Sequence, residues 1–342
     1  MANNILSIRP LGFPWETQDP FLFCVHHLDH YPPGNDKMGP DPKHFVGRNI
    51  GNDFVTKNGW RMYHGSEVPG FPYHPHRGFE TITIGLRGFV DHTDSLGAAG
   101  RFGNGDVQWM TAGRGLQHSE MFPLINREDN NTLEIFQIWL NLPRKNKMVD
   151  PHFKMLWANE IPIVNVTDDA GNSTQLRIIA GNYNGAKAPS PAPNSWAAEN
   201  ENDVAVWTVK LEPNAQFTIP KASTNKVNRS LYFYSGDSLT IDNKAIDKQA
   251  VIDLNSQADI SLKNGNEASF LLMLQGKPIE EPVAQHGPFV MNTRQEIQDA
   301  FMEYQRTEFG GWPWPAREFT HPRDKGRFAL YADGTEETPN LQ

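Results

Sequence analysis

Short apolar runs recur along the whole chain, separated by glycine, proline, asparagine and aspartate. They are rich in valine, isoleucine, threonine and aromatic residues, which is typical of β-strands. The pattern predicts strands over residues 81–90, 107–111, 133–142 and 176–180. A second series is predicted over 204–211, 230–234, 238–241, 250–254 and 269–274. Many short strands without intervening helices favour sandwiches or barrels, jelly rolls included.

One helix is predicted near the end of the chain. Residues 293–296 read Thr-Arg-Gln-Glu, a capping box in which hydroxyl and carboxylate each accept a hydrogen bond from an unpaired N–H group. The apolar residues that follow fall on one helical face, and the glycines at 310 and 311 end the pattern. That face consists of Ile297, Ala300, Phe301 and Tyr304.

Length favours two domains. Of the 342 residues 38% are hydrophobic, enough for one large or two medium cores, and two fits the usual domain size better. The prediction is an all-β protein with two tandem domains, residues 1–145 and 146–305, and an irregular tail over 306–342 that lies across the body. Residues 182–203 are rich in proline, alanine and asparagine and are expected to form an irregular loop.

Charge and cysteine content narrow the class of protein. The formal net charge is −9 and no cluster of lysine and arginine suggests a basic face, so direct nucleic-acid binding is not expected. Cys24 is the single cysteine, which rules out an intrachain disulfide framework. The sequence shows no signal peptide and no apolar run long enough to cross a membrane. We therefore expect a soluble cytoplasmic protein.

The first group of chemistry-bearing residues begins at His74. Residues 70–80 read Gly-Phe-Pro-Tyr-His-Pro-His-Arg-Gly-Phe-Glu. Because alternate side chains of a strand share a face, an extended chain places His74, His76 and Glu80 on one face and Thr83 on the other. Imidazoles two residues apart in a strand are close enough to bind one ion together.

A second group lies at residues 113–121, Gly-Arg-Gly-Leu-Gln-His-Ser-Glu-Met. His118 and Glu120 share a face if this piece is extended. Together the two groups offer three neutral imidazoles and one carboxylate, a donor set suited to Fe(II), Mn, Ni, Cu or Zn. Four protein ligands on a six-coordinate ion leave two positions open, which is a feature of reactive rather than structural sites.

The remaining histidines are expected to pack or to form hydrogen bonds. They are His26, His27, His30, His44, His64, His92, His152, His286 and His321. From Val204 to Lys277 the sequence has no histidine and no carboxylates paired at strand spacing, so the second domain is expected to hold no metal.

Four motifs resemble the pirin family of the cupin superfamily. They read His-Pro-His-Arg-Gly-Phe-Glu-Thr from residue 74, Gly-Asp-Val-Gln-Trp-Met-Thr-Ala-Gly-Arg-Gly-Leu-Gln-His-Ser-Glu-Met from 105, Gln-Ile-Trp-Leu-Asn-Leu-Pro from 137 and Glu-Pro-Val-Ala-Gln-His-Gly-Pro-Phe-Val-Met-Asn-Thr from 281. The resemblance implies two cupin domains with one metal in the first. The metal is expected to be Fe(II), with Mn, Ni, Cu, Zn or Co also open, and its ligands His74, His76, His118 and Glu120. Glu80 is then expected beside the metal without binding it.

Three segments depart from shorter pirins: residues 31–68, residues 182–203 and the tail after Phe309. The first precedes the metal motif directly and is expected to shape the pocket mouth. Apolar side chains that could wall the pocket are Phe71, Phe79, Trp109, Met110, Met121 and Phe122.

The resemblance implies two alternative functions. One is a dioxygenase that opens a flavonol such as quercetin with O2, in which Glu120 or Glu80 accepts the hydroxyl proton. The other is an iron-dependent adaptor that binds a regulator or a metabolic enzyme, the oxidation state altering the loops around Arg77 and Arg114. A degraded enzyme with residual activity is a third possibility.

Overall fold

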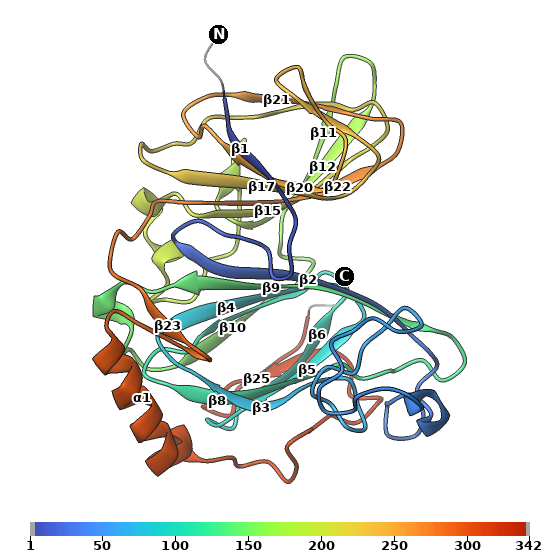
Figure 1. Cartoon of the computed structure of the whole chain (residues 1–342), viewed down its shortest axis with the longest axis vertical. Helices are drawn as coiled ribbons and strands as arrows, with labels where there is room; N and C mark the ends of the chain where they lie inside the picture. The colour runs from blue at the N-terminus through green and yellow to red at the C-terminus, as the bar shows by residue number, and fades with distance from the viewer. Residues whose placement is uncertain (1–3, 340–342) are drawn as a thin grey trace. The chain divides into compact units, whose positions relative to one another are not determined.

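The computed structural model describes residues 4–339, which form short strands and one α-helix, α1 (Arg294–Thr307) (Figure 1). The predicted strand series is confirmed, in places to the residue, as for β7 (Val107–Thr111) and β20 (Ala250–Leu254). The predicted strand 81–90 is wrong in one respect. It is two strands, β4 (Phe79–Arg87) and β5 (Phe89–Asp94), because Gly88 between them adopts a positive φ of 76° and turns the chain.

The chain divides into two compact units that interleave in sequence. The first unit contains residues 26–137, 144–159 and 281–339, and the second contains residues 4–25, 138–143 and 160–280. The predicted linear boundaries at residues 145 and 305 do not coincide with this division. The units interleave because segments distant in sequence pack together. Strand β1 (Ile5–Pro10), near the start of the chain, pairs with β20 in the second unit, whereas α1, near the end, packs within the first.

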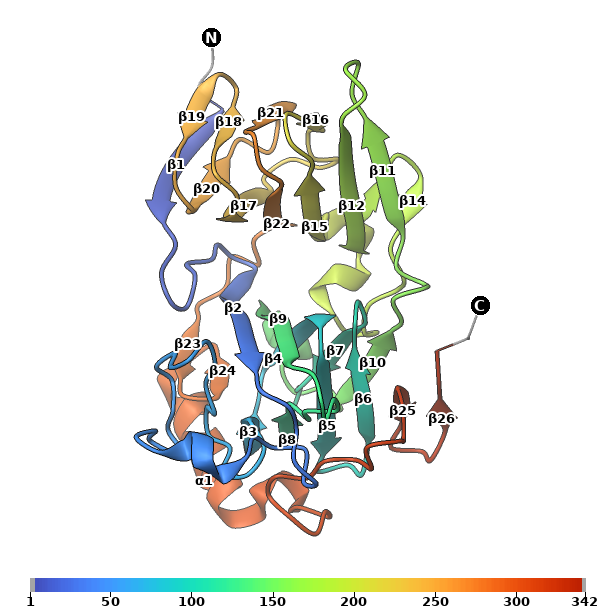
Figure 2. The ribbon, with the colours of Figure 1, turned by 90° about the vertical axis from the view of Figure 1, so that its right-hand side faces the viewer.

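Most strands of the first unit belong to two sheets. One has the order β10 (His152–Leu156), β7, β4, β9 (Asn131–Asn141) and β2 (Phe21–Tyr31), and Figure 2 shows these strands side by side. The other has the order β26 (Glu336–Glu337), β25 (Phe328–Leu330), β6 (Ala99–Gly103), β5, β8 (Leu116–Met121) and β3 (Gly70–His76). Short 3₁₀ turns lie at Pro42–Phe45, Arg144–Asn146 and Glu308–Gly310. Between the sheets lies an apolar core that includes Met110, Phe122 and Ile135.

The second unit has its own core of apolar strand residues, among them Trp207, Leu231 and Met273. Its large sheet has the order β1, β20, β17 (Asn228–Ser235), β22 (Ser269–Gly276), β15 (Ala205–Leu211), β12 (Ser173–Ala180) and β11 (Ile163–Thr167). A smaller sheet has the order β16 (Gln216–Ile219), β21 (Ile260–Asn264), β18 (Leu239–Ile241) and β19 (Lys244–Ile246). The predicted loop 182–203 contains the hairpin β13 (Asn182–Tyr183) and β14 (Ala186–Lys187) and 3₁₀ turns at Trp196–Ala198 and Asn200–Asn202.

Helix α1 begins at the predicted capping box. The Thr293 hydroxyl accepts from the backbone N–H of Glu296, whose carboxylate accepts from the N–H of Thr293 in return. Its apolar face packs on the hairpin of β23 (Ala284–His286) and β24 (Phe289–Met291). No helix among residues 4–339 has the length and apolar character that a membrane span requires.

The C-terminal segment is ordered against the first unit, as expected for a tail lying across the body, but it is not wholly irregular. Its strand β25 pairs with β6, and Arg101 of β6 anchors the residues before it. The Arg101 guanidinium forms two bonds to the buried carboxylate of Asp91 and donates to the backbone carbonyls of residues 321–323. The tail therefore adds strands to the sheet that carries all four predicted ligands, His74 and His76 on β3 and His118 and Glu120 on β8.

Candidate metal centre

The two predicted ligand motifs lie on neighbouring strands. Strand β3 carries His74 and His76, strand β8 carries His118, and His74 and His118 are paired in the antiparallel register. One ring nitrogen from each of the three histidines lies within 4.8 Å of the others, the one such group found among residues 4–339. The structure thus brings together three of the four predicted ligands from segments about 40 residues apart in the sequence.

A β-bulge in β3 extends the inward-facing row. Phe71 pairs with Glu120 and His74 with His118, so three residues of β3 span two of β8. Paired residues of two neighbouring strands point to the same side of a sheet. Phe71 and His74 are three residues apart and would otherwise point to opposite sides, but the extra residue of the bulge turns both side chains to the same side. Pro72 occupies the bulge, where a missing N–H group is tolerated. Phe71 therefore shares the face of the ligand histidines.

The geometry of the imidazoles fits a single ion. The Nε2 atoms of His74 and His118 are 3.1 Å apart. Two ligands at right angles on an ion at about 2.1 Å lie roughly 3.0 Å apart, which matches this spacing. The Nδ1–H of His74 donates to the Pro72 carbonyl at 3.0 Å and that of His76 to the Pro288 carbonyl at 3.4 Å. These bonds leave each Nε2 with its lone pair, as a metal ligand requires.

Glu120 lies beside the histidine cluster. Its carboxylate is 3.7 Å from the Nε2 atom of His118, and it accepts hydrogen bonds from the Thr83 hydroxyl and the Gln137 amide, each at 3.2 Å. Thr83 and Gln137 come from β4 and β9 of the facing sheet. They fix the orientation of the carboxylate and are partners that the sequence did not reveal, although Gln137 begins one of the family motifs.

Glu80 does not join the cluster, contrary to the expectation that it shares a face with His74 and His76. The chain breaks at Gly78, whose φ is 86°, so residues 70–87 form two strands in different sheets. Thr83 reaches Glu120, and Glu80 is out of phase with Thr83 along β4. The Glu80 carboxylate instead accepts from the Thr111 hydroxyl at 2.7 Å. The structure therefore places Glu80 out of phase with Thr83 and engages its carboxylate with Thr111.

Burial keeps the three imidazoles neutral. Desolvation lowers the pKa of His74 to about 4 and lowers those of His76 and His118 well below the ordinary value of 6.5. Positive charge on neighbouring imidazoles lowers the pKa of His76 and His118 further. Neutral imidazole is the form that binds metals. Near neutral pH, the three imidazoles therefore need to lose few protons in order to bind a metal.

Burial acts in the opposite direction on Glu120. Desolvation raises the pKa of its carboxyl, while charge on His92 and the bonds from Thr83 and Gln137 lower it. His92 is fully buried, pairs with Glu120 in the register of β5 and β8, and has its ring centroid 5.5 Å from that of His118. Sequence reasoning treated His92 as an ordinary packing residue, because a lone histidine carries no spacing signal.

Segment 31–68 joins β2 and β3, the edge strands of the two sheets. Its Tyr63 ring packs 5.1 Å from Phe71 of β3, and the Tyr63 hydroxyl bonds His27 and Asp29 of β2, so the segment contacts both of these strands. Phe79 packs 5.0 Å from His76, as a pocket wall would. Trp109 of β7, in contrast, pairs with Ile82 of β4. Ile82 is out of phase with Thr83, so Trp109 lies on the face of this sheet that points away from Glu120.

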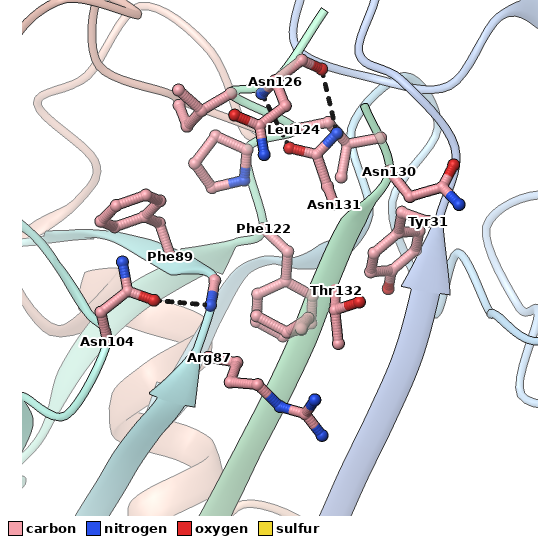
Figure 3. Close-up of a pocket in the computed structure, with 14 residues that line it drawn as sticks. Tyr31, Arg87, Phe89, Asn104, Phe122, Leu124, Asn126, Asn130, Asn131 and Thr132 are labelled. Atoms are coloured by element: carbon pink, nitrogen blue, oxygen red, sulfur yellow. Dashed lines mark hydrogen bonds between the residues drawn. The ribbon is translucent and has the colours of Figure 1, made fainter. Parts of the chain in front are cut away.

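A separate pocket of about 300 Å³ is lined in part by Phe122 (Figure 3). Its lining includes Arg87, Phe89, Asn104 and Thr132, but none of the predicted ligands. The Asn104 side-chain carbonyl accepts from the N–H of Gly88, and the Asn131 amide donates to the Asn126 carbonyl. Much of its polar lining is thus engaged within the protein.

Two family models match the chain. Residues 16–140 match the model described as Pirin, and residues 206–310 match the Pirin C-terminal cupin domain. A Pseudomonas aeruginosa protein, named only provisionally as a quercetin 2,3-dioxygenase, is 37% identical over 244 residues, 70% of this chain and 79% of that protein. Human pirin is 34% identical over 256 residues, 72% of this chain and 80% of pirin.

Solved structures show the same fold. A crystal structure of quercetin 2,3-dioxygenase from Acinetobacter baumannii superposes with a TM-score of 0.68 at 28% identity. The match covers 90% of this chain and 98% of the other. The expected pair of cupin domains is therefore confirmed.

Proposed function

The chain belongs to the pirin family, and from this premise we propose that it is a metal-dependent dioxygenase that opens a flavonol such as quercetin. The observation that carries the proposal is the cluster of His74, His76 and His118 nitrogens in a cupin related to a quercetin 2,3-dioxygenase of known structure. We propose Glu120 as the fourth ligand and iron as the metal. The buried, neutral imidazoles and the adjacent carboxylate support this assignment.

A divalent metal held by this donor set supplies a Lewis acid that lowers the pKa of a flavonol hydroxyl. The protein itself positions the carboxylate of Glu120, which can act as the base. Glu120 is 5% exposed and is held by Thr83 and Gln137, so its carboxylate has a fixed orientation in a site that excludes most water. We assign it the role of accepting the hydroxyl proton. Glu80, bonded to Thr111, is withdrawn from that role.

The test is oxygen-dependent turnover. Iron-loaded protein should consume the quercetin absorbance band under O2 and release carbon monoxide, and removal of the metal should abolish both. His118→Ala, which removes a buried ligand, is expected to lose turnover, whereas His152→Ala, at an exposed position on β10, should retain it. Absence of flavonol turnover by protein with a full complement of iron would contradict the proposal.

One contact favours the adaptor as a second candidate. Arg77, between His76 and Gly78, donates to the Arg114 carbonyl at 2.6 Å and forms an ion pair at 2.9 Å with Glu303 on α1. The Glu303 side chain is 42% exposed, so the ligand strand is connected to the protein surface. Capture of a protein partner that depends on the iron oxidation state, and is lost in Glu303→Ala, would support this function. The single buried cysteine is consistent with the cytoplasmic location that we propose for either function.

A further inference from the structure

Segment 31–68 presents aromatic rings at the surface beside the histidine cluster. The ring centroids of Phe54 and His64 are 4.9 Å apart, and both rings also contact Phe71 of β3, at 6.3 and 5.9 Å. Phe54 is 37% exposed, His64 is exposed and Phe71 is partly exposed. We refer to Phe54, His64 and Phe71 as the aromatic platform. Exposed aromatic surface that gathers at one place usually marks a binding site.

The platform adjoins the predicted ligands through Phe71. The bulge at Pro72 places Phe71 on the inward face of β3, paired with Glu120. The Phe71 ring lies edge-on to His74, with centroids 6.3 Å apart. His74 and Phe71 are both partly exposed, so each ring presents some surface to solvent. A ligand on the platform would therefore lie next to the ring of His74, one of the proposed metal ligands.

Hydrogen bonds and an ion pair of neighbouring residues fix the backbone that carries the aromatic platform. Asp53, which precedes Phe54, exchanges two backbone hydrogen bonds with Tyr63, which precedes His64, at 2.8 and 3.0 Å. The Asp53 carboxylate forms a buried ion pair with Arg48, whose guanidinium lies 3.3 Å from the Trp60 ring centroid. The Tyr63 hydroxyl donates to Asp29 at 2.6 Å and also bonds the His27 Nδ1 atom at 2.8 Å. Such preorganisation reduces the entropy lost when a ligand binds.

His64 adds a polar group of defined direction. Its Nδ1–H donates to the Gly51 carbonyl at 2.9 Å, which leaves Nε2 as the hydrogen-bond acceptor. Two phenyl rings and one imidazole acceptor match a planar aromatic molecule that carries hydroxyl groups. A planar ring gains from stacked or edge-on contact with Phe54 and Phe71, and a phenolic hydroxyl can donate to His64.

We propose that the aromatic platform binds the aromatic rings of a polyhydroxylated planar ligand and sets which flavonoids the protein accepts. The identity of the ligand class rests on the function proposed above. Phe54 and His64 lie in the segment that departs from shorter pirins, so they are specificity-determining positions of this chain. His64 acts by accepting a hydroxyl hydrogen, and Phe54 by ring contact.

The experiment measures binding of a flavone that lacks the 3-hydroxyl group to iron-loaded full-length protein without oxygen, by quenching of tryptophan fluorescence. Phe54→Ala should raise Kd by about tenfold and His64→Gln by about three- to tenfold, the range expected for loss of one aromatic or hydrogen-bonded contact. Phe54→Leu, which keeps apolar bulk, should fall between wild type and Phe54→Ala. Val46→Ala, in the same segment but 79% exposed, should leave Kd unchanged.

Phe89→Ala is the matched aromatic control, because Phe89 lines the separate pocket of Figure 3. A Kd that rises in Phe89→Ala and stays at the wild-type value in Phe54→Ala would overturn the platform and assign the ligand to that pocket. Flavone binding through Phe54 without flavonol turnover would sink the dioxygenase and leave the platform intact. Turnover with an unchanged quercetin KM in Phe54→Ala and His64→Gln would sink the platform and leave the dioxygenase intact.

Discussion

His74 and His118 face each other as paired residues of two antiparallel strands, with their Nε2 atoms 3.1 Å apart. A strand pair fixes the two backbones, and hydrogen bonds from Nδ1 fix the rings of His74 and His76. The fold itself therefore positions the backbones of all three histidines, and hydrogen bonds hold the rings of two of them. This rigidity is what a metal site needs to select one coordination geometry.

Removal of one imidazole should empty the site. We expect His118→Ala to lower the affinity for iron by at least about 100-fold, because loss of an outer partner alone typically costs 10- to 100-fold. His152→Ala removes an exposed histidine of the same unit and should keep the wild-type content. Elemental analysis after dialysis against a weak chelator checks this, and retention of iron by His118→Ala would mean that the cluster is not the site.

The groups that hold Glu120 should matter more than Glu80. Gln137→Leu removes the amide that donates to Glu120 and is expected to weaken iron binding by about 10- to 100-fold. Glu80→Gln should leave iron affinity and flavonol turnover near wild type, because Glu80 lies on the opposite face of β4. Titration of each variant with iron gives the answer, and an empty site in Glu80→Gln alone would reverse the assignment.

Much of the site was predictable because local spacing carries it. His74 and His76, and likewise His118 and Glu120, alternate as strand residues do, and their convergence follows from strand pairing. The capping box at Thr293 was predictable for a similar reason, since its two hydrogen bonds join residues three apart. Patterns within one strand or one helical turn are set by local geometry.

What the sequence did not reveal depends on single-residue irregularities and on distant partners. Gly78 breaks the strand and reverses the phase of Glu80, and no periodicity shows that a glycine will adopt a positive φ there. The bulge at Pro72 brings Phe71 to the ligand face by one extra residue. His92 is placed beside Glu120 only by the pairing of β5 with β8. The pairing of β1 with β20 likewise joins residues about 240 apart in the sequence.

Acid should destabilise the metal-free protein. Burial lowers the folded-state pKa of His27 to about 3 and of His74 to about 4, and lowers that of His76 and His118 well below 6.5. Between pH 6.5 and 4 the unfolded chain therefore binds more protons than the folded chain, so stability present above pH 6.5 is lost as the pH falls.

Two buried carboxyls oppose this trend, because desolvation raises the pKa of Glu120 and Asp29. The histidines with a lowered pKa, which also include His152 and His321, outnumber these two carboxyls, so we expect a net loss of stability between pH 6 and 5. Urea unfolding of chelator-treated protein at several pH values measures it. A free energy of unfolding that does not change over this range would contradict the burial of neutral imidazoles.

The tail should depend on one buried ion pair. Arg101→Met leaves the carboxylate of Asp91 buried without its guanidinium partner and removes the bonds to the carbonyls of residues 321–323. A loss of about 3–5 kcal/mol is expected for breaking such a pair. Trypsin should then cleave near Lys325 more readily than in wild type.

The matched control for the tail is Arg127→Ala. It breaks an ion pair with Asp36 in which both side chains are more than half exposed, at 58% and 89%, and little change is expected. Equal effects of Arg101→Met and Arg127→Ala on unfolding and on cleavage would show that the buried pair has no special role.

The central claim is one metal bound by His74, His76, His118 and Glu120. X-ray absorption on iron-loaded protein tests it most directly, together with the iron content of the same sample. The account predicts about one iron per chain, scattering from three imidazoles and from oxygen, and loss of one oxygen contribution or of the metal in Glu120→Gln. Sulfur scattering, two irons per chain, or an unchanged spectrum in His118→Ala would contradict it.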